Sequence, residues 1–216
     1  CGEIPMGEYD SCRLIHQNLA SYVEHPFTQK AYLNIPLLIK HTKYAMRLAD
    51  DLIDLEIEHM DKIICKIESV SNISEILDQN NSLIKRISSE AELWLKIRIN
   101  TLMGRRAGLG HTGLADCAAM LGIKYGSDDF LTFTEKITSI LFITQLTTQI
   151  ELAKERGAFP AFNSSLESFY CEDANMFIGN NSWYSWLIKK YPNHAKEMSL
   201  YGRRNISWST VKIAAA

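Results

Sequence analysis

Long stretches with apolar residues at helical spacing limit most strongly what this chain can fold into. Residues 37–100 form a helical segment, with one amphipathic helix over residues 37–67 that has room for a single break and a second helix over residues 82–100. The longest helical run covers residues 128–156, and Gly157 closes it as the residue just past the helix end. The chain is therefore expected to be rich in helix.

Two other stretches have strand character. Residues 101–121 are expected to form a strand–turn–helix unit, with a buried strand over residues 101–109. Residues 205–213 alternate and carry β-branched side chains, which predicts a C-terminal strand. Residues 14–23 fit either a short strand or a helical turn, and this choice stays open. Strands between long helices indicate an α/β fold.

The first twelve residues bring thiols and a carboxylate close together in sequence. Gly2, Pro5 and Gly7 make a continuous helix unfavourable, so residues 1–12 are expected to form a loop. A loop can present the candidate chemical groups, the Cys1 and Cys12 thiols and the Glu3 carboxylate, to a ligand. The alternative is two buried structural cysteines and a surface glutamate, because buried cysteine is common.

Three blocks along the chain resemble one family in order and in residue type. The first is Cys1-Gly-Glu-Ile-Pro with Cys12-Arg-Leu and Asn18-Leu. The second is Arg105-Arg-Ala-Gly-Leu-Gly-His-Thr-Gly-Leu-Ala-Asp116, and the third is Tyr201-Gly-Arg-Arg-Asn-Ile-Ser-Trp-Ser-Thr210. Together they resemble the catalytic (large) subunit of ribonucleotide reductases. This resemblance implies that the chain, residues 1–216, is a single fragment of the family's ten-stranded α/β barrel, incomplete here.

The resemblance assigns roles to the loop residues. Cys1 becomes the cysteine whose thiyl radical abstracts the 3′ hydrogen of a ribonucleotide, and Glu3 the base that takes the 3′-hydroxyl proton. Gly2, between them, is expected to contact the substrate. Cys12 becomes one of two reducing thiols that form a disulfide as the deoxyribonucleotide for DNA synthesis is made. Its partner thiol lies upstream in the family.

The short spacing from Cys1 to Cys12 resembles the adenosylcobalamin-dependent class of the family. The alternatives are the oxygen-dependent class, which needs a separate radical subunit, and a catalytically inactive scaffold module. The resemblance also implies allosteric nucleotides in the full-length enzyme and a thioredoxin-like or glutaredoxin-like reductant. Because the chain starts at Cys1 and stops before the family's phosphate-binding turn, we expect a fragment that needs the remainder of the reductase chain for activity.

Gly108, Gly110 and Gly113 match the G-x-G-x-x-G pattern of dinucleotide-binding folds. That function would need an acidic residue about 20 positions on, after a second strand. Asp128 and Asp129 lie near that distance, but they follow a glycine turn and are expected to cap the next helix. The resemblance instead implies a tight strand-to-helix turn.

Charge and cysteine content exclude several functional classes. A formal net charge of -2 gives no strong attraction to nucleic acid or to acidic membranes, and no apolar run reaches about 18 residues, so no membrane span is expected. Five irregularly spaced cysteines are typical of a reducing cytoplasm rather than of a disulfide framework, and no pair has the spacing of a zinc site.

An acidic cluster is the remaining candidate for a metal site. Asp50, Asp51 and Asp54, with Glu58 and His59 nearby, suggest metal ligands. The alternative is a solvated helix face of acidic residues paired with lysines, comprising Asp51, Asp54, Glu58 and Asp61 with Lys62 and Lys66. Because the ligands would be spread around a helix, no metal site is predicted.

Overall fold

The structure is a computed structural model that describes residues 6–77, 81–163, 169–171, 176–178 and 182–209. Cys1, Gly2 and Glu3 lie outside the described residues, and so do residues 210–213 of the predicted C-terminal strand.

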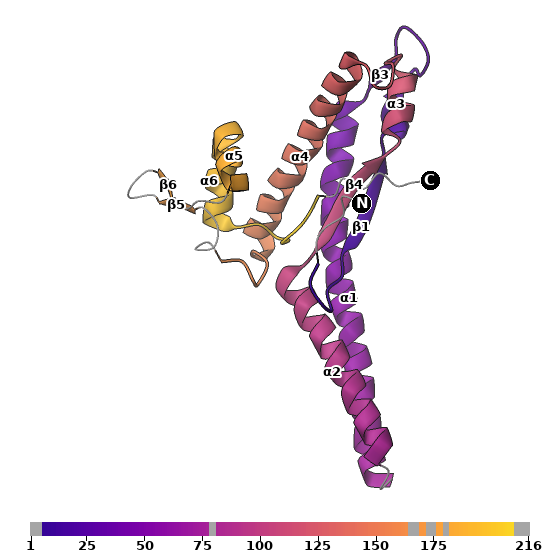
Figure 1. Cartoon of the computed structure of the whole chain (residues 1–216), viewed down its shortest axis with the longest axis vertical. Coiled ribbons are helices and arrows are strands. Elements are labelled where there is room, and N and C mark those ends of the chain that lie inside the picture. The colour runs from indigo at the N-terminus through magenta and orange to yellow at the C-terminus, as the bar shows by residue number, and fades with distance from the viewer. Residues whose placement is uncertain (1–5, 78–80, 164–168, 172–175, 179–181, 210–216) are drawn as a thin grey trace.

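Two long helices form an arm that projects from the rest of the molecule (Figure 1). Helix α1 (Ile35–Leu77) runs for 43 residues, and α2 (Asn81–Gly104) packs beside its second half. The Asn34 side chain accepts a hydrogen bond from the Leu37 amide at 3.1 Å, which satisfies one free donor of the first turn of α1. Because α1 is continuous from Ile35 to Leu77, the single break allowed over residues 37–67 does not occur, and the helix continues ten residues beyond the predicted end.

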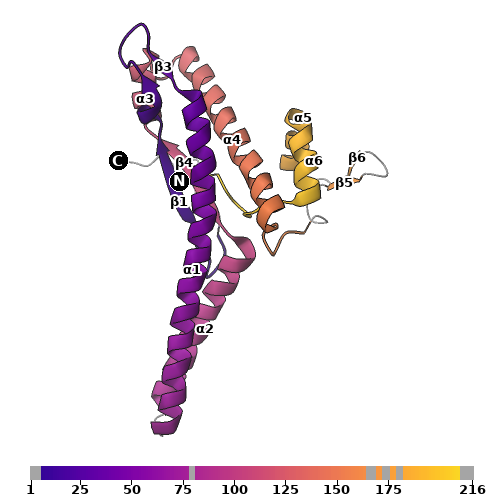
Figure 2. The same cartoon turned by 180° about the vertical axis from the view of Figure 1, so that it is seen from behind.

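Parallel strands lie against the first half of α1. Strand β1 (Arg13–Asn18) pairs with β4 (Ala107–Thr112), with Ile15 opposite Leu109. Near the C-terminus of the chain, Ser209 lies beside β4 and forms an isolated parallel bridge with Leu109. In Figure 2, seen from behind, β1 and β4 run beside α1 while α4 lies along the other flank of that helix.

Two predicted strands differ from the observed ones. The strand expected over residues 101–109 begins only at Ala107, because α2 continues to Gly104 and the Arg105 amide still donates to the Thr101 carbonyl at 2.9 Å. Within residues 205–209 the predicted C-terminal strand is reduced to the bridge at Ser209. Its first amide is taken by a side chain, since Asn205 N donates to Gln149 Oε1 at 2.9 Å instead of joining a ladder.

Helix α4 (Asp128–Arg156) has the bounds that apolar spacing predicts, but with 29 residues it is shorter than α1, so the expectation that it is the longest helical run is wrong. Ser127 caps its start by accepting from the Phe130 amide at 3.2 Å, and Gly157 follows its end with φ of +85°. For residues 14–23 the sequence allowed either a short strand or a helical turn, and the structure contains both, together with a further strand. These residues end β1, form the 3-10 helix η1 (Leu19–Tyr22) and begin β2 (Val23–Glu24), which pairs with β3 (Tyr32–Leu33).

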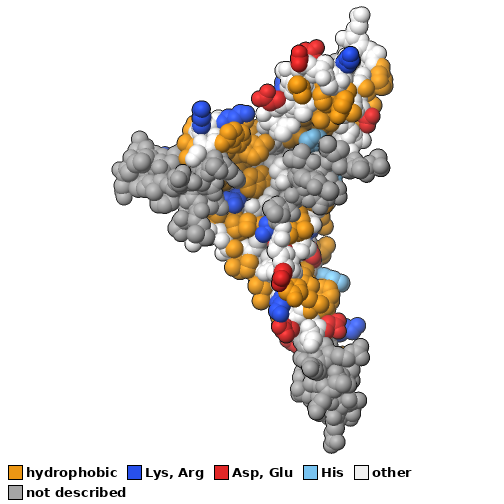
Figure 3. All heavy atoms as spheres, viewed as in Figure 1, with side chains coloured by type: hydrophobic (Ala, Val, Ile, Leu, Met, Phe, Trp, Pro, Cys, Tyr) orange, Lys and Arg blue, Asp and Glu red, His pale blue; other side chains and the backbone are white. Residues whose placement is uncertain are grey.

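Among the remaining elements, α6 (Pro192–Tyr201) packs against α4. Helix α3 (Leu114–Met120) follows β4 through Gly113, and its Cys117 lies in a core with Leu19 and Ile137. The other elements are β5 (Phe169–Cys171), β6 (Met176–Ile178) and α5 (Ser182–Lys190). Figure 3 shows hydrophobic side chains exposed over the middle of the visible face, below charged groups at its upper end.

The larger core lies between α1, α4, β4 and α6. Its fully buried side chains interlock from elements that are distant in sequence: they include Met46, Ile53, Leu109, Leu146, Ile150 and Met198. Among the described residues, none of the helices combines the length and the apolar content that crossing a bilayer requires.

Candidate functional site

Cys12 directly precedes β1 and has a half-buried side chain. Its thiol lies 4.0 Å from the Arg13 carbonyl oxygen as a weak hydrogen-bond donor. Residues 6–12 form no helix or strand, as expected for the loop. The predicted meeting of Cys12 with Cys1 and Glu3 around one cavity stays a prediction, because both partners lie outside the described residues.

The segment before Cys12 is fixed to the end of α2 and to the corner beyond it. Asp10 forms an ion pair with Arg106, the residue that precedes β4. Asn100 Nδ2 donates to the Glu8 carbonyl oxygen at 2.8 Å. These contacts come from residues more than 90 positions away. They hold the loop at the start of the two parallel strands.

The residue after Cys12 is fixed as well. The Arg13 side chain is 9% exposed, and its guanidinium pairs with Glu56 of α1. It also donates to the Ser11 carbonyl oxygen at 3.0 Å and to Thr101 Oγ1 at 3.2 Å. Charge-assisted hydrogen bonds of this kind are stronger than neutral ones. Cys12 therefore lies between two anchored positions.

The alternation of β1 separates its two faces. Gln17 faces α1, where Thr42 Oγ1 donates to Gln17 Oε1 at 2.9 Å. His16 points to the opposite face, and the residue beside it on β4 is Gly110. Glycine on a strand leaves room for close approach of a ligand or another backbone. On the face that continues from Cys12 through His16, the neighbouring β4 residue is thus a buried glycine without a side chain.

Two histidines lie near each other on the strand pair. Burial lowers the pKa of His111, and the nearby His16 lowers it further. Neutral imidazole is therefore favoured at His111. His16 Nε2 is buried and has no hydrogen-bond partner among the described residues.

Sequence reasoning missed a buried charge centre at Asp50. This side chain is fully buried in the middle of α1. Arg105 Nη2 lies 2.7 Å from Asp50 Oδ1, and Arg156 Nη1 and Arg204 Nε each lie 3.0 Å from Oδ2. Asn205 Nδ2 donates to Oδ1 at 3.3 Å. One carboxylate thus joins α1 to the start of β4, the end of α4 and the C-terminal stretch.

Each of the two arginine pairs in the sequence contributes one residue to this centre. Arg203-Arg204 precedes the strand predicted over residues 205–213, whereas Arg105-Arg106 lies inside the strand predicted over residues 101–109, and sequence alone does not relate the two pairs. In the structure, Arg105 and Arg204 meet at Asp50. Arg203 instead lies over aromatic rings, with its guanidinium carbon 5.2 Å from the Phe159 ring centre.

The electrostatics of Asp50 follow from these contacts. Burial alone raises the pKa of this carboxyl group, but hydrogen bonds and charge from Arg105, and then the charge of Arg204, outweigh it and lower the pKa overall. Burial likewise works against the charge of Arg105, yet Asp54 and Asp50 raise its pKa overall. The group is held as an ionised network.

The acidic residues lie closer together than the sequence implied. Oxygen atoms of Asp50, Asp51 and Asp54 lie within 4.8 Å of one another, so the expectation that they spread around the helix is wrong. The reason is that Arg105 bonds both Asp50 and Asp54, while Arg156 bonds both Asp50 and Asp51. Arginine donors occupy the position between the carboxylates. The absence of a metal ion stays a prediction.

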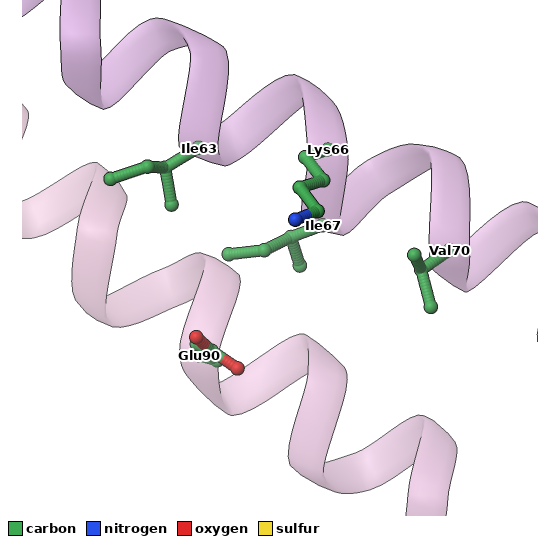
Figure 4. Close-up of a pocket in the computed structure, with 5 residues that line it drawn as sticks. All are labelled: Ile63, Lys66, Ile67, Val70 and Glu90. Carbon is green, nitrogen blue, oxygen red and sulfur yellow. The ribbon is translucent and has the colours of Figure 1, made fainter.

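Three acidic residues of α1 are exposed as the solvated face predicts, but their ion pairs are with arginines rather than with the predicted lysines. The side chains of Asp51, Asp54 and Asp61 are between 46% and 53% exposed. Asp61 pairs with Arg98 of α2 across the arm. An open groove on the arm is lined mainly by apolar side chains of α1, together with Lys66 of the same helix and Glu90 of α2 (Figure 4). It brings together no set of chemically reactive groups.

Two further cysteines lie on helices. Cys65 is exposed on α1, and Cys117 is buried on α3, where burial raises the pKa of its thiol to about 11. A buried, protonated thiol is a poor nucleophile. Neither residue lies on the strand pair that carries Cys12.

Comparison with known proteins identifies the family that this chain resembles. The family model described as "Ribonucleotide reductase, barrel domain" matches residues 1–212. A ribonucleoside-diphosphate reductase large subunit of African swine fever virus (isolate Tick/South Africa/Pretoriuskop Pr4/1996) is 35% identical over 102 residues, covering 47% of this chain and 12% of the viral protein.

Other relatives are named as vitamin B12-dependent ribonucleoside-diphosphate reductases. The protein of Mycobacterium tuberculosis (strain ATCC 25618 / H37Rv) is 26% identical over 170 residues, covering 76% of this chain and 18% of that protein. The protein of Thermoplasma acidophilum is 28% identical over 165 residues, covering 76% of this chain and 16% of its own length. The chain therefore spans less than a fifth of the length of these relatives.

Proposed function

This chain belongs to the ribonucleotide reductase family, within the barrel domain, and we propose that the protein containing it reduces ribonucleotides to deoxyribonucleotides. The observation that carries this proposal is the match over residues 1–212, which includes all three blocks quoted from the sequence. The helices and parallel strands described above are then part of an incomplete α/β barrel.

In this proposal the loop residues divide the chemistry among them. A thiyl radical on Cys1 abstracts the 3′ hydrogen, and Glu3 accepts the 3′-hydroxyl proton. Loss of the 2′-hydroxyl as water leaves a centre that two thiols reduce, becoming a disulfide. Cys12 is one of these thiols, and its partner comes from outside this chain. Gly2 lets the backbone approach the ribose closely.

The anchoring of Cys12 supports its part in this division. A reducing thiol must reach both its partner and the substrate, which requires a fixed start to its strand. Before Cys12 in the sequence, Asp10 is held by its ion pair with Arg106, and directly after Cys12, Arg13 is held by its ion pair with Glu56. On the face that continues from Cys12, Gly108 and Gly110 of β4 lie beside Leu14 and His16 and add no side chain there.

We assign the radical source to the adenosylcobalamin-dependent class. The short Cys1-to-Cys12 spacing and the 76% coverage by relatives named B12-dependent support this assignment. Bound adenosylcobalamin would supply the organic radical that oxidises the Cys1 thiol. None of the described residues forms a recognisable cobalamin contact, so none is assigned to the cofactor. The viral relative, at 35% identity, is named as a large subunit, which keeps a class with a separate radical subunit as the alternative.

The proposed activity implies further partners. A thioredoxin-like or glutaredoxin-like protein would reduce the disulfide, and allosteric nucleotides would bind elsewhere in the full-length chain. A cytoplasmic location fits thiols that must be kept reduced. The isolated fragment is expected to be inactive, because the partner thiol is not part of it.

The test is deoxyribonucleotide formation by the full-length protein with a dithiol reductant. We expect activity in the unmodified enzyme and its loss in Cys12→Ser. The matched control is Cys65→Ser, which replaces an exposed thiol on the arm and should leave activity unchanged. Absence of activity in the unmodified enzyme, with nucleotide and radical source supplied, would favour the inactive scaffold instead.

A further inference from the structure

The ion pair between Asp10 and Arg106 is largely buried in the protein. The Asp10 side chain is 8% exposed and that of Arg106 is 19% exposed. The second oxygen of Asp10 accepts a hydrogen bond from the Ser11 amide at 2.9 Å. Burying a carboxylate is costly unless it is paired and hydrogen-bonded, and both conditions are met here. Asp10 lies two residues before Cys12 in the sequence.

Arg106 is itself held by a strained corner. The preceding residue, Arg105, has φ of +47°, in the left-handed region that non-glycine residues rarely adopt. Such a conformation persists only when the surroundings enforce it, and it clusters at functional positions. The Arg105 side chain is fixed by Asp50 and Asp54. The corner therefore directs one arginine into the buried charge centre and the next toward the loop.

We propose that Arg106 is a positioning residue that fixes the Cys12 thiol through Asp10. This inference rests on the proposed function, in which Cys12 and a partner thiol lose two electrons and two protons to form a disulfide. The ribose accepts the electrons at C2′, and its hydroxyl leaves as water. Disulfide formation requires the two sulfurs to meet with a narrow range of dihedral angles. A loop that is fixed beforehand meets this requirement at each turnover.

The first measurement uses the reduced full-length protein and needs no activity. Iodoacetamide labelling of Cys12 is followed by mass spectrometry in Asp10→Asn and in Arg106→Met. Removing an anion beside a thiol lowers its pKa, and removing a cation raises it. A purely electrostatic effect would therefore move the two rates in opposite directions. Loss of positioning exposes the thiol in both, and we expect both rates to rise roughly threefold or more.

The second measurement is the ratio of deoxyribonucleotide formed to tritium released from 3′-labelled nucleotide. We expect both variants to lower this ratio about tenfold, because hydrogen abstraction continues while reduction fails. Arg106→Lys keeps a cation and should recover part of the ratio. The control is Lys43→Met, which removes an exposed ion pair with Glu151 and should change neither measurement.

Three results would overturn the inference. They are unchanged labelling of Cys12, labelling rates that move in opposite directions, and equal losses of tritium release and product. If a variant does not fold, labelling in Arg106→Lys and Asp10→Glu decides the question. If the unmodified enzyme neither releases tritium nor forms product, the proposed function fails, and the labelling rates alone then support or overturn the positioning of Cys12.

Discussion

Arg105 and Asp50 form a buried ion pair, with Nη2 and Oδ1 2.7 Å apart and side chains 3% and 0% exposed. The two residues are 55 positions apart in sequence. Their contact joins the middle of α1 to the corner where α2 turns into β4. Arg156 and Arg204 complete the charge balance from two further parts of the chain.

Asp50→Asn should lower the free energy of unfolding by about 3–5 kcal/mol, because it leaves buried arginines without their counter-charge. Asp51→Asn is the matched control, since it removes a carboxylate that is 53% exposed and pairs with Arg156. The control should cost less than about 1 kcal/mol. Urea unfolding of both variants measures the difference, and equal losses would contradict a special role for Asp50.

The same centre gives a pH dependence. Because the pKa of Asp50 lies below its ordinary value of 3.8 in the folded protein, its contribution to stability is fully present above that value. The contribution is lost as the pH falls through the lower folded-state pKa. The acid branch of the stability curve should therefore be flatter in Asp50→Asn than in the unmodified protein.

Gly113→Ala should destabilise the turn between β4 and α3. Gly113 has φ of +69°, and a Cβ atom there would lie 2.2 Å from Asn18 Oδ1, which accepts the hydrogen bond from the Ala20 amide. We expect a loss of about 2 kcal/mol or more in unfolding free energy. Gly122→Ala isolates the backbone strain, since Gly122 has φ of +75° and open space around it. A control that loses as much stability would show that the Asn18 contact contributes nothing.

The acidic cluster should hold no metal ion. Arginine donors already bond Asp50, Asp51 and Asp54, so a divalent cation would have to displace them. Elemental analysis of the purified protein should find no tightly held ion at this site, and Asp54→Ala should leave the metal content unchanged. One bound equivalent that is lost in Asp54→Ala would contradict this prediction.

Reduction by the full-length enzyme should depend on added adenosylcobalamin and should need neither oxygen nor a second protein subunit. The short Cys1-to-Cys12 spacing motivates this expectation. Anaerobic assays with and without the cofactor measure it. Activity that ignores adenosylcobalamin and requires a partner subunit would keep the family assignment but change the class.

Local signals predicted the helices well. The bounds of α4 follow from apolar spacing and from Gly157 at its end, which act over a few residues. The predicted cap was wrong, because Ser127 caps the helix while Asp128 and Asp129 lie in its first turn.

Of the three glycines expected in the turn into α3, Gly113 does form it with a left-handed backbone, but Gly108 and Gly110 lie within β4. The start of β4 was misplaced because the α2 helix extends past Asn100 to Gly104, where the corner at Arg105 ends it.

The charge centre was beyond sequence reasoning for a physical reason. The partners of Asp50 are 55, 106 and 154 residues away, and nothing in the helical pattern of α1 marks one aspartate among several as buried. Only tertiary packing distinguishes Asp50 from Asp51. The anchoring of Cys12 by Arg106 depends on the same long-range contacts, whereas the identity of the loop itself came from the motif.

The most direct test of the central claim is tritium release from 3′-labelled ribonucleotide by Cys1→Ser in the full-length enzyme, measured beside deoxyribonucleotide yield. A serine O–H bond is too strong to form the radical readily, so both signals should disappear. Cys12→Ser should keep tritium release while clean reduction is lost, because only the electron supply is removed. Ordinary deoxyribonucleotide formation by Cys1→Ser would contradict the assignment of Cys1 as the radical site.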